Sequence, residues 1–154
     1  MNLDKLEKTI NESFEKKEKV NPKSDKKIIK AINETIDLVD QGKIRVANKI
    51  NGNWVVNQWI KKAILLSFRV NKMTMSKGPY TTWYDKVPGK TVKWKESDWK
   101  KAGYRHVPNG VVRRGSFIAK NAVLMPSFVN LGAYVDEGTM IDTWASVGSC
   151  AQVG

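Results

Sequence analysis

The first part of the chain repeats apolar residues with the spacing of a helix. They recur three and four positions apart at Leu3, Leu6, Ile10 and Phe14. After Pro22 the spacing returns at Ile28, Ile29, Ile32, Ile36 and Val39. Such spacing gathers the apolar side chains on one face of each segment. The sequence therefore predicts two amphipathic helices, over residues 3–18 and from residue 24 or 25 to Gly42.

The pattern changes after Gly42. Residues 43–58, KIRVANKINGNWVVNQ, alternate apolar and polar side chains around Asn51-Gly52, a pair that tolerates the positive φ angles of a tight turn. This alternation predicts a β-hairpin. Residues 58–70, QWIKKAILLSFRV, are apolar on every side and predict the buried centre of an α-rich domain over residues 1–70. Glycine, proline, lysine and aromatic residues mix without a period at 71–110, which predicts a connector with short strands.

An apolar residue then returns at every sixth position. These residues are Val111, Phe117, Val123, Val129, Val135, Ile141, Val147 and Val153. Four positions after them stand the smaller residues Gly115, Asn121, Ser127, Ala133, Thr139, Ala145 and Ala151. A period of six is typical of a short strand and a turn, repeated three times per triangular coil, with the large residues inside and equivalent positions stacked in parallel sheets. The pattern predicts the first coils of a parallel β-helix over residues 111–154, and thus an α+β chain in two parts.

Composition excludes several classes of function. The formal net charge of +12 attracts anions, but no basic stripe with interleaved aromatics indicates nucleic-acid binding. Neither a signal peptide nor a membrane-spanning apolar run is visible, so we expect no membrane association. Cys150 is the only cysteine; it therefore has no disulfide partner in the chain, and we expect a reducing, cytoplasmic location. The tryptophans, including Trp144, are expected to fill the core or an interface.

Several segments are more specific than the hexad. QWIKKAILLSFRVN, WYDKVP, GYRHVP and YVDEGTMIDTWASVGSCAQVG resemble the tetrahydrodipicolinate N-succinyltransferase family of hexapeptide-repeat acyltransferases, over the whole chain but only about the first half of such an enzyme. The resemblance implies a left-handed coil and a homotrimer with active sites between neighbouring β-helices. It also implies transfer of a succinyl group from succinyl-CoA, a co-substrate, to the amino group of ring-opened tetrahydrodipicolinate, a step of diaminopimelate and lysine biosynthesis. No permanently bound cofactor is implied.

The resemblance assigns substrate binding to Arg105, in GYR, and to Asp142, in DTW. A guanidinium offers the planar pair of donors that a carboxylate of the substrate needs. Asp142 follows Ile141, which is predicted to face inward, so the aspartate should face outward beside Leu124 in a partly dry setting. A carboxylate there can take the proton that an amine loses before it attacks a thioester, and we expect Asp142 to be catalytic. The alternatives are a solvent-facing aspartate and, for Arg105, a surface cation.

Other reactive side chains are weaker candidates. His106 is the only histidine and adjoins Arg105, but no partner defines a catalytic role for it. Cys150 has no histidine in phase to activate its thiol, and no His/Cys cluster indicates a metal site. The resemblance places most of the CoA-binding groove in later coils, so we expect the CoA-binding residues after Gly154.

The hexad is still running at Gly154, and a coil that stops there leaves its last strands unpaired. We therefore expect the chain to be a truncated product or a fragment, with its own activity left open. Two alternatives to a succinyltransferase remain. One is a non-catalytic scaffold that associates with like subunits, and the other is a related acyltransferase that uses another acyl-CoA.

Overall fold

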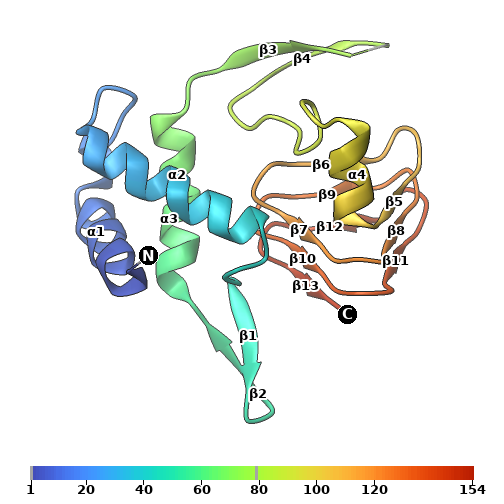
Figure 1. Ribbon diagram of the computed structural model, residues 1–154. Coiled ribbons are helices and arrows are strands. Elements are labelled where there is room, and N and C mark those ends of the chain that lie inside the picture. Colours follow the sequence, from blue (N-terminus) through green and yellow to red (C-terminus); the bar gives the residue numbers. More distant parts are fainter. Residues whose placement is uncertain (1, 79) are drawn as a thin grey trace.

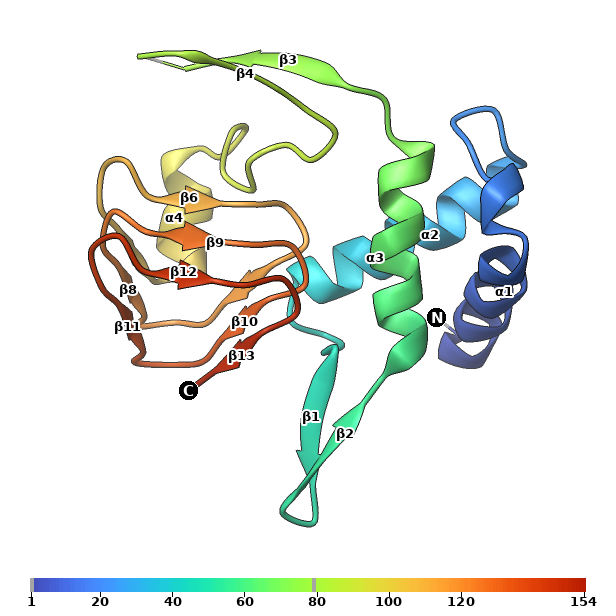
Figure 2. The ribbon, with the colours of Figure 1, turned by 180° about the vertical axis from the view of Figure 1, so that it is seen from behind.

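The computed structural model describes residues 2–78 and 80–154. A helical part and a coil of short strands lie side by side (Figures 1 and 2). The helical part consists of α1 (Leu3–Glu15), the 3-10 turn η1 (Lys17–Lys19), α2 (Lys26–Asp40) and α3 (Gln58–Val70). Two hairpins project from it, β1 (Ala47–Ile50) with β2 (Asn53–Val56), and β3 (Thr74–Lys77) with β4 (Thr82–Asp85).

Helices α1 and α2 begin at residues whose side chains cap them. The Asn2 side chain accepts the backbone N–H of Lys5 at 3.0 Å and starts α1. The Asp25 carboxylate accepts the N–H of Lys27 at 2.7 Å and starts α2, as the sequence predicts. The first helix ends at Glu15, earlier than predicted, and continues as the 3-10 turn.

The third helix is the buried centre of the helical part. It packs against both α1 and α2, and its buried residues are Trp59, Ile60, Ala63, Ile64, Leu66, Ser67 and Val70. This confirms the prediction made from its apolar composition. The β1–β2 hairpin is also confirmed, because Asn51 and Gly52 form the turn with φ angles of 50° and 81°.

One helix in the region predicted as a connector with short strands was not foreseen. Helix α4 (Glu96–Ala102) begins where the Asp98 carboxylate accepts the N–H of Lys95 at 2.8 Å, and it ends at Gly103, with φ of 69°. The terminal signals are present in the sequence, but the helix is short and presents no long apolar face. It packs Trp99 against the end of the coil.

The coil consists of two-residue strands in three parallel sheets. Its strands are β5 (Arg105–His106), β6 (Val111–Val112), β7 (Phe117–Ile118), β8 (Val123–Leu124), β9 (Phe128–Val129), β10 (Tyr134–Val135), β11 (Met140–Ile141), β12 (Ser146–Val147) and β13 (Gln152–Val153). They pair in the orders β5-β8-β11, β6-β9-β12 and β7-β10-β13. Each strand thus stacks on the third strand before it, and the chain begins a parallel β-helix, as predicted (Figure 2).

The first coil is buried one residue out of the predicted phase. The sequence predicts Val111, Phe117 and Val123 inside, whereas the buried residues are Val112, Ile118 and Leu124. From Val129 onward the predicted phase is confirmed, with Val129, Val135, Ile141 and Val147 buried and Val153 partly buried against the same core.

A shortened rung causes this slip. We call the segment from one inward residue to the next a rung, and the rung from Leu124 to Val129 is one residue shorter than the others. Its corner contains Pro126. Adjacent apolar residues, such as Val111-Val112 and Val123-Leu124, satisfy either phase, so the sequence pattern alone did not reveal the slip.

The full-length rungs turn their corners with a residue in the left-handed backbone conformation. It stands three positions after each inward residue, at Asn109, Gly115, Asn121, Gly132, Gly138, Trp144 and Cys150, with φ between 60° and 86°. This conformation costs a residue with a Cβ about 1–2 kcal/mol, and asparagine tolerates it best. A tryptophan at such a corner is therefore unexpected.

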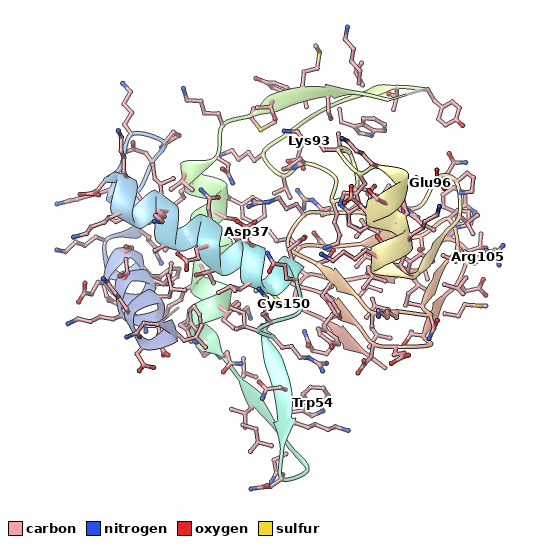
Figure 3. All side chains as sticks on the ribbon, in the orientation of Figure 1. Asp37, Trp54, Lys93, Glu96, Arg105 and Cys150 are labelled. Carbon is pink, nitrogen blue, oxygen red and sulfur yellow. The ribbon has the colours of Figure 1, made fainter. Side chains whose placement is uncertain are left out.

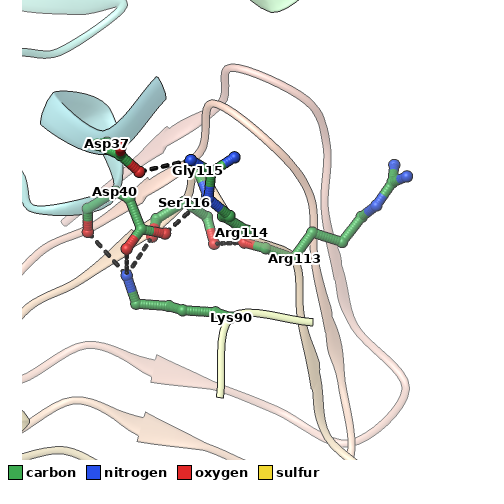
Figure 4. A network of polar contacts seen from close by, with 7 residues as sticks. All are labelled: Asp37, Asp40, Lys90, Arg113, Arg114, Gly115 and Ser116. Carbon is green, nitrogen blue, oxygen red and sulfur yellow. Dashed lines mark hydrogen bonds and ion pairs between the residues drawn. The ribbon is translucent and has the colours of Figure 1, made fainter. Parts of the chain in front are cut away.

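A buried ion pair joins the helical part to the coil (Figure 4). The Lys90 side chain, only 6% exposed, contacts the Asp40 carboxylate at 2.7 Å. Its Nζ also donates to the carbonyl oxygens of Asp40 (2.7 Å) and Ser116 (3.0 Å), and Asp40 accepts the backbone N–H of Gly115 at 2.7 Å. Burial lowers the pKa of Lys90, against the opposing effect of Asp40. The C-terminal end of α2 is thereby fixed to the corner of the coil at Gly115.

Further contacts support this junction. Arg114 donates to the Asp37 carboxylate at 2.6 Å. Leu131 from the coil is 1% exposed and belongs to the apolar core of the helices. Arg45, at the base of the β1–β2 hairpin, lies 3.5 Å from the ring centre of Tyr134. The two parts therefore share a polar and an apolar interface.

We expect Lys90→Met to destabilise the chain by about 3 kcal/mol, because it leaves the Asp40 carboxylate without its cationic partner and two carbonyl oxygens without their donor. Urea unfolding followed by circular dichroism measures the effect. Lys93→Met is the matched control, since Lys93 is exposed on the same loop; it should change stability by less than about 0.5 kcal/mol. Equal midpoints for the two variants would contradict the role given to Lys90.

Candidate functional site

Arg105 and Asp142 lie on one outer side of the coil, that of the sheet β5-β8-β11. Arg105 pairs with Val123, and Val123 pairs with Met140. Asp142 directly follows β11, and both charged residues neighbour an inward residue, so both face outward and are exposed. Figure 3 shows Arg105 at the outer edge of the coil. From strand spacing and rise per residue, the two Cα atoms are roughly 12 Å apart. An extended ligand with two polar ends spans such a distance.

The surroundings of Asp142 differ from those predicted. The shortened rung places Met125, not Leu124, beside Asp142 in the sheet, since the Met125 N–H donates to the carbonyl of Ile141 at 2.9 Å. Asp142 is exposed to solvent in the single chain, so the partly dry setting is wrong for the chain by itself. One carboxylate oxygen accepts the N–H of Thr143 at 2.7 Å. The other oxygen has no partner among the described residues and faces outward.

Large apolar side chains flank the aspartate. Met140 is 62% exposed and Trp144 is 84% exposed, the highest fraction among the large apolar residues that the structure describes. The N–H of Trp144 donates to the carbonyl of Pro126 at 2.8 Å. Asp142 carries the only charged side chain between Gly138 and Gly154. Asp142 is thus a single carboxylate with an exposed apolar side chain two positions away on each side. Trp144 does not fill the core of this chain, whereas its place in an interface stays a prediction.

His106 faces the interior, away from this surface. Its ring centre lies 5.5 Å from that of Trp99 and 6.3 Å from that of Tyr104, in an aromatic cluster that closes the first end of the coil. Burial lowers the pKa of His106, against a smaller opposing effect of the Gly110 backbone. Within the described residues, its Nε2 has no hydrogen-bond partner. The imidazole therefore belongs to the aromatic cluster and does not contact the outward Asp142.

Cys150 stands at another corner of the coil, toward the helices (Figure 3). It is partly buried against the apolar core of the helical part, and its Sγ lies 3.6 Å from Ser149 Oγ. Because Asp142 lies at a different corner, the thiol is not part of the same surface.

The rest of the described chain contains a groove but no cluster typical of a metal site. Within residues 2–78 and 80–154, no three His, Cys, Asp or Glu side chains are grouped so as to hold a metal ion. No helix in the same ranges has the length and apolar character to cross a membrane. A groove of about 800 Å³ lies between α1 and α2, lined by several lysines and far from the coil (Figure 1).

A parallel coil of six-residue rungs defines the chain as a hexapeptide-repeat protein. Residues 5–70, ahead of the coil, match the family described as tetrahydrodipicolinate N-succinyltransferase N-terminal. The chain is thus similar to the N-terminal part of tetrahydrodipicolinate N-succinyltransferases.

Curated relatives agree with this family. A protein of Parvibaculum lavamentivorans is named 2,3,4,5-tetrahydropyridine-2,6-dicarboxylate N-succinyltransferase. It is 52% identical to this chain, and the match covers all of the chain and 56% of that protein. A protein of Rhodopseudomonas palustris with the same name is 54% identical, with the same shares covered. One of Pelagibacter ubique, also so named, is 61% identical over 88% of the chain and 50% of its own length. The chain spans about half the length of the curated relatives that it matches.

We expect the stability of the chain to fall as the pH drops below the ordinary pKa of histidine, 6.5, because of His106. Its pKa is lowered in the folded state, so between that value and 6.5 the unfolded chain binds more protons, and acidification favours unfolding. Urea midpoints at about pH 5.5 and about pH 7.5 measure this loss. His106→Phe keeps a ring in the aromatic cluster and should remove most of the difference. An equal difference in both proteins would contradict the assignment.

Proposed function

We propose that the whole protein carrying this sequence transfers a succinyl group from succinyl-CoA to the amino nitrogen of ring-opened 2,3,4,5-tetrahydropyridine-2,6-dicarboxylate, a step of diaminopimelate and lysine biosynthesis. The observation that carries the proposal is the identity of 52% and 54%, over all of this chain, to relatives bearing that enzyme name. Arg105 and Asp142, which the family resemblance selects, face outward on one side of the coil and support it.

Arg105 binds one carboxylate of the acceptor. Opening of the cyclic imine by water gives a ketone and an amine, with a carboxylate at each end of the molecule. A guanidinium can hold one carboxylate through two parallel hydrogen bonds. Arg105 makes no hydrogen bond or ion pair with another described side chain, so its donors are available. This contact places the amine end of the acceptor toward Asp142.

Asp142 orients the amine and takes its proton. The N–H of Thr143 holds one carboxylate oxygen, and the other oxygen is left for the acceptor. The deprotonated nitrogen attacks the thioester carbonyl carbon of succinyl-CoA, and a tetrahedral intermediate forms. The attacking nitrogen loses a second proton, the C–S bond breaks, the CoA thiolate leaves and takes up that proton, and a neutral amide remains. The loss of the ammonium proton is the step that needs the carboxylate.

We also propose a left-handed coil in a cytoplasmic homotrimer, as the family resemblance implies. Outward residues of the coil support an assembly, since Val111, Phe128 and Met140 are 42%, 37% and 62% exposed. Apolar side chains on the outside of a coil are stabilised when a neighbouring subunit covers them. A neighbour would also remove water from around Asp142, which a single chain leaves exposed.

The direct test measures CoA release with a thiol reagent, in the presence and absence of the ring-opened acceptor. Succinyl-CoA should support turnover, and acetyl-CoA should support much less. Turnover with acetyl-CoA but not with succinyl-CoA would favour the related acyltransferase. Assembly without turnover from either donor would favour the non-catalytic scaffold.

Asp142→Asn should lower kcat by about 100-fold or more, because the amide cannot take the amine proton. Its free energy of unfolding should change by less than about 0.5 kcal/mol, since the residue is exposed. Asp136→Asn is the matched control: Asp136 also follows an inward residue but lies beside β10, on another side of the coil. Steady-state kinetics and urea unfolding compare the two. Unchanged turnover in Asp142→Asn would reject the proposed role.

Arg105→Ala should raise the KM of the acceptor by about 10- to 100-fold, the value of a charge-assisted contact to a carboxylate. Arg105→Lys should recover only part of this loss, because an ammonium lacks the planar pair of donors. Lys101→Ala removes a nearby exposed charge and serves as the control. An acceptor KM that rises equally in Lys101→Ala would indicate general electrostatic attraction instead of a specific contact.

A further inference from the structure

Trp144 combines two properties that its own chain does not explain. Its backbone is left-handed, with φ of 60°, at a corner where glycine would be free of strain. Its side chain is 84% exposed, so packing within the chain compensates neither the strain nor the exposed apolar surface. The equivalent corners use glycine, asparagine or cysteine. The indole at this position therefore points to a contact with a molecule outside the chain.

The turn holds Trp144 next to Asp142. Two residues span at most about 7 Å, so their Cα atoms lie within that distance. The backbone between them is fixed, because Ala145 donates to the carbonyl of Asp142 at 3.1 Å and Trp144 donates to that of Pro126 at 2.8 Å. The indole and the free carboxylate oxygen therefore project from one rigid corner.

We propose that Trp144 contacts the acceptor substrate, covering one side of the molecule held between Arg105 and Asp142. The inference rests on the proposed function, which supplies an acceptor with charged ends and methylene groups between them. An indole offers a large apolar face to the methylene groups, and its ring attracts the ammonium group before deprotonation. By covering the amine, it also keeps water from the nitrogen that must lose its proton. Trp144 is thus a positioning residue for the acceptor.

Trp144→Gly separates this role from a structural one. Glycine relieves the left-handed strain, so the thermal midpoint should stay equal or rise by about 2–4 °C. The acceptor KM should nevertheless rise about tenfold or more, with the KM of succinyl-CoA within about twofold, the effect of losing one aromatic contact. Trp144→Phe keeps an aromatic face and should stay within about threefold of the original acceptor KM. A variant that is as stable but binds the acceptor less well is not expected of a residue that only supports the fold.

Two further measurements make the test decisive. Cys150→Gly replaces a left-handed residue at a corner away from Asp142 and should leave both KM values unchanged. Calorimetric titration with L-2-aminoheptanedioate, a seven-carbon 2-amino dicarboxylate, measures acceptor binding without catalysis. If Trp144→Gly binds the analogue more weakly than the unaltered protein does, the proposal for Trp144 is supported. A lack of succinyl transfer in the same experiments would reject only the proposed function.

Three results would overturn the role of Trp144. The first is an acceptor KM and analogue affinity in Trp144→Gly equal to those of the unaltered protein. The second is a smaller sedimenting mass of Trp144→Gly than of the unaltered protein, if this loss of assembly accounts for the lost activity. The indole would then be a contact between subunits. The third is failure of the unaltered protein to bind the analogue at all.

Discussion

The stacking of apolar side chains inside the coil is the constraint on which the rest of the structure depends. Each strand of the coil is two residues long and pairs only with the strands of the neighbouring coils. An inward residue must therefore lie directly over the equivalent residue of the previous coil. The alternation of side chains then fixes which residues face outward. Arg105 and Asp142 face solvent because His106 and Ile141 stack with Leu124 between them.

The shortened rung shows how strong this constraint is. The rung between Leu124 and Val129 is one residue shorter than the others, and this shifts the six-residue period of the inward residues along the sequence. The stack of buried side chains nevertheless continues unbroken. The corner absorbs the difference, since it is the part of a rung that does not pair within a sheet. The sheets therefore set the geometry of the candidate site, whereas the residue type differs from corner to corner within the chain. Trp144, at the corner that follows Asp142, is the clearest example.

The helical part is held against the coil by a few specific contacts. Lys90 and Asp40 form a largely buried ion pair at the Gly115 corner, and Leu131 of the coil belongs to the apolar core of the helices. This junction lies away from the sheet that bears Arg105 and Asp142. The outward face of that sheet is left free for a ligand or for a second subunit, while the opposite parts of the coil are already used within the chain.

Local sequence determined the helices α1 to α3, the turn at Asn51-Gly52 and the three-sided coil, because spacing and turn chemistry act over a few residues. It also selected Arg105 and Asp142, through a family resemblance. Only the tertiary structure decided the inward phase of the first coil, since adjacent apolar residues such as Val111 and Val112 satisfy both phases and stacking on the next coil chooses between them. It likewise decided that Asp142 lies beside Met125 and faces solvent, because strand pairing, not sequence distance, sets its neighbours.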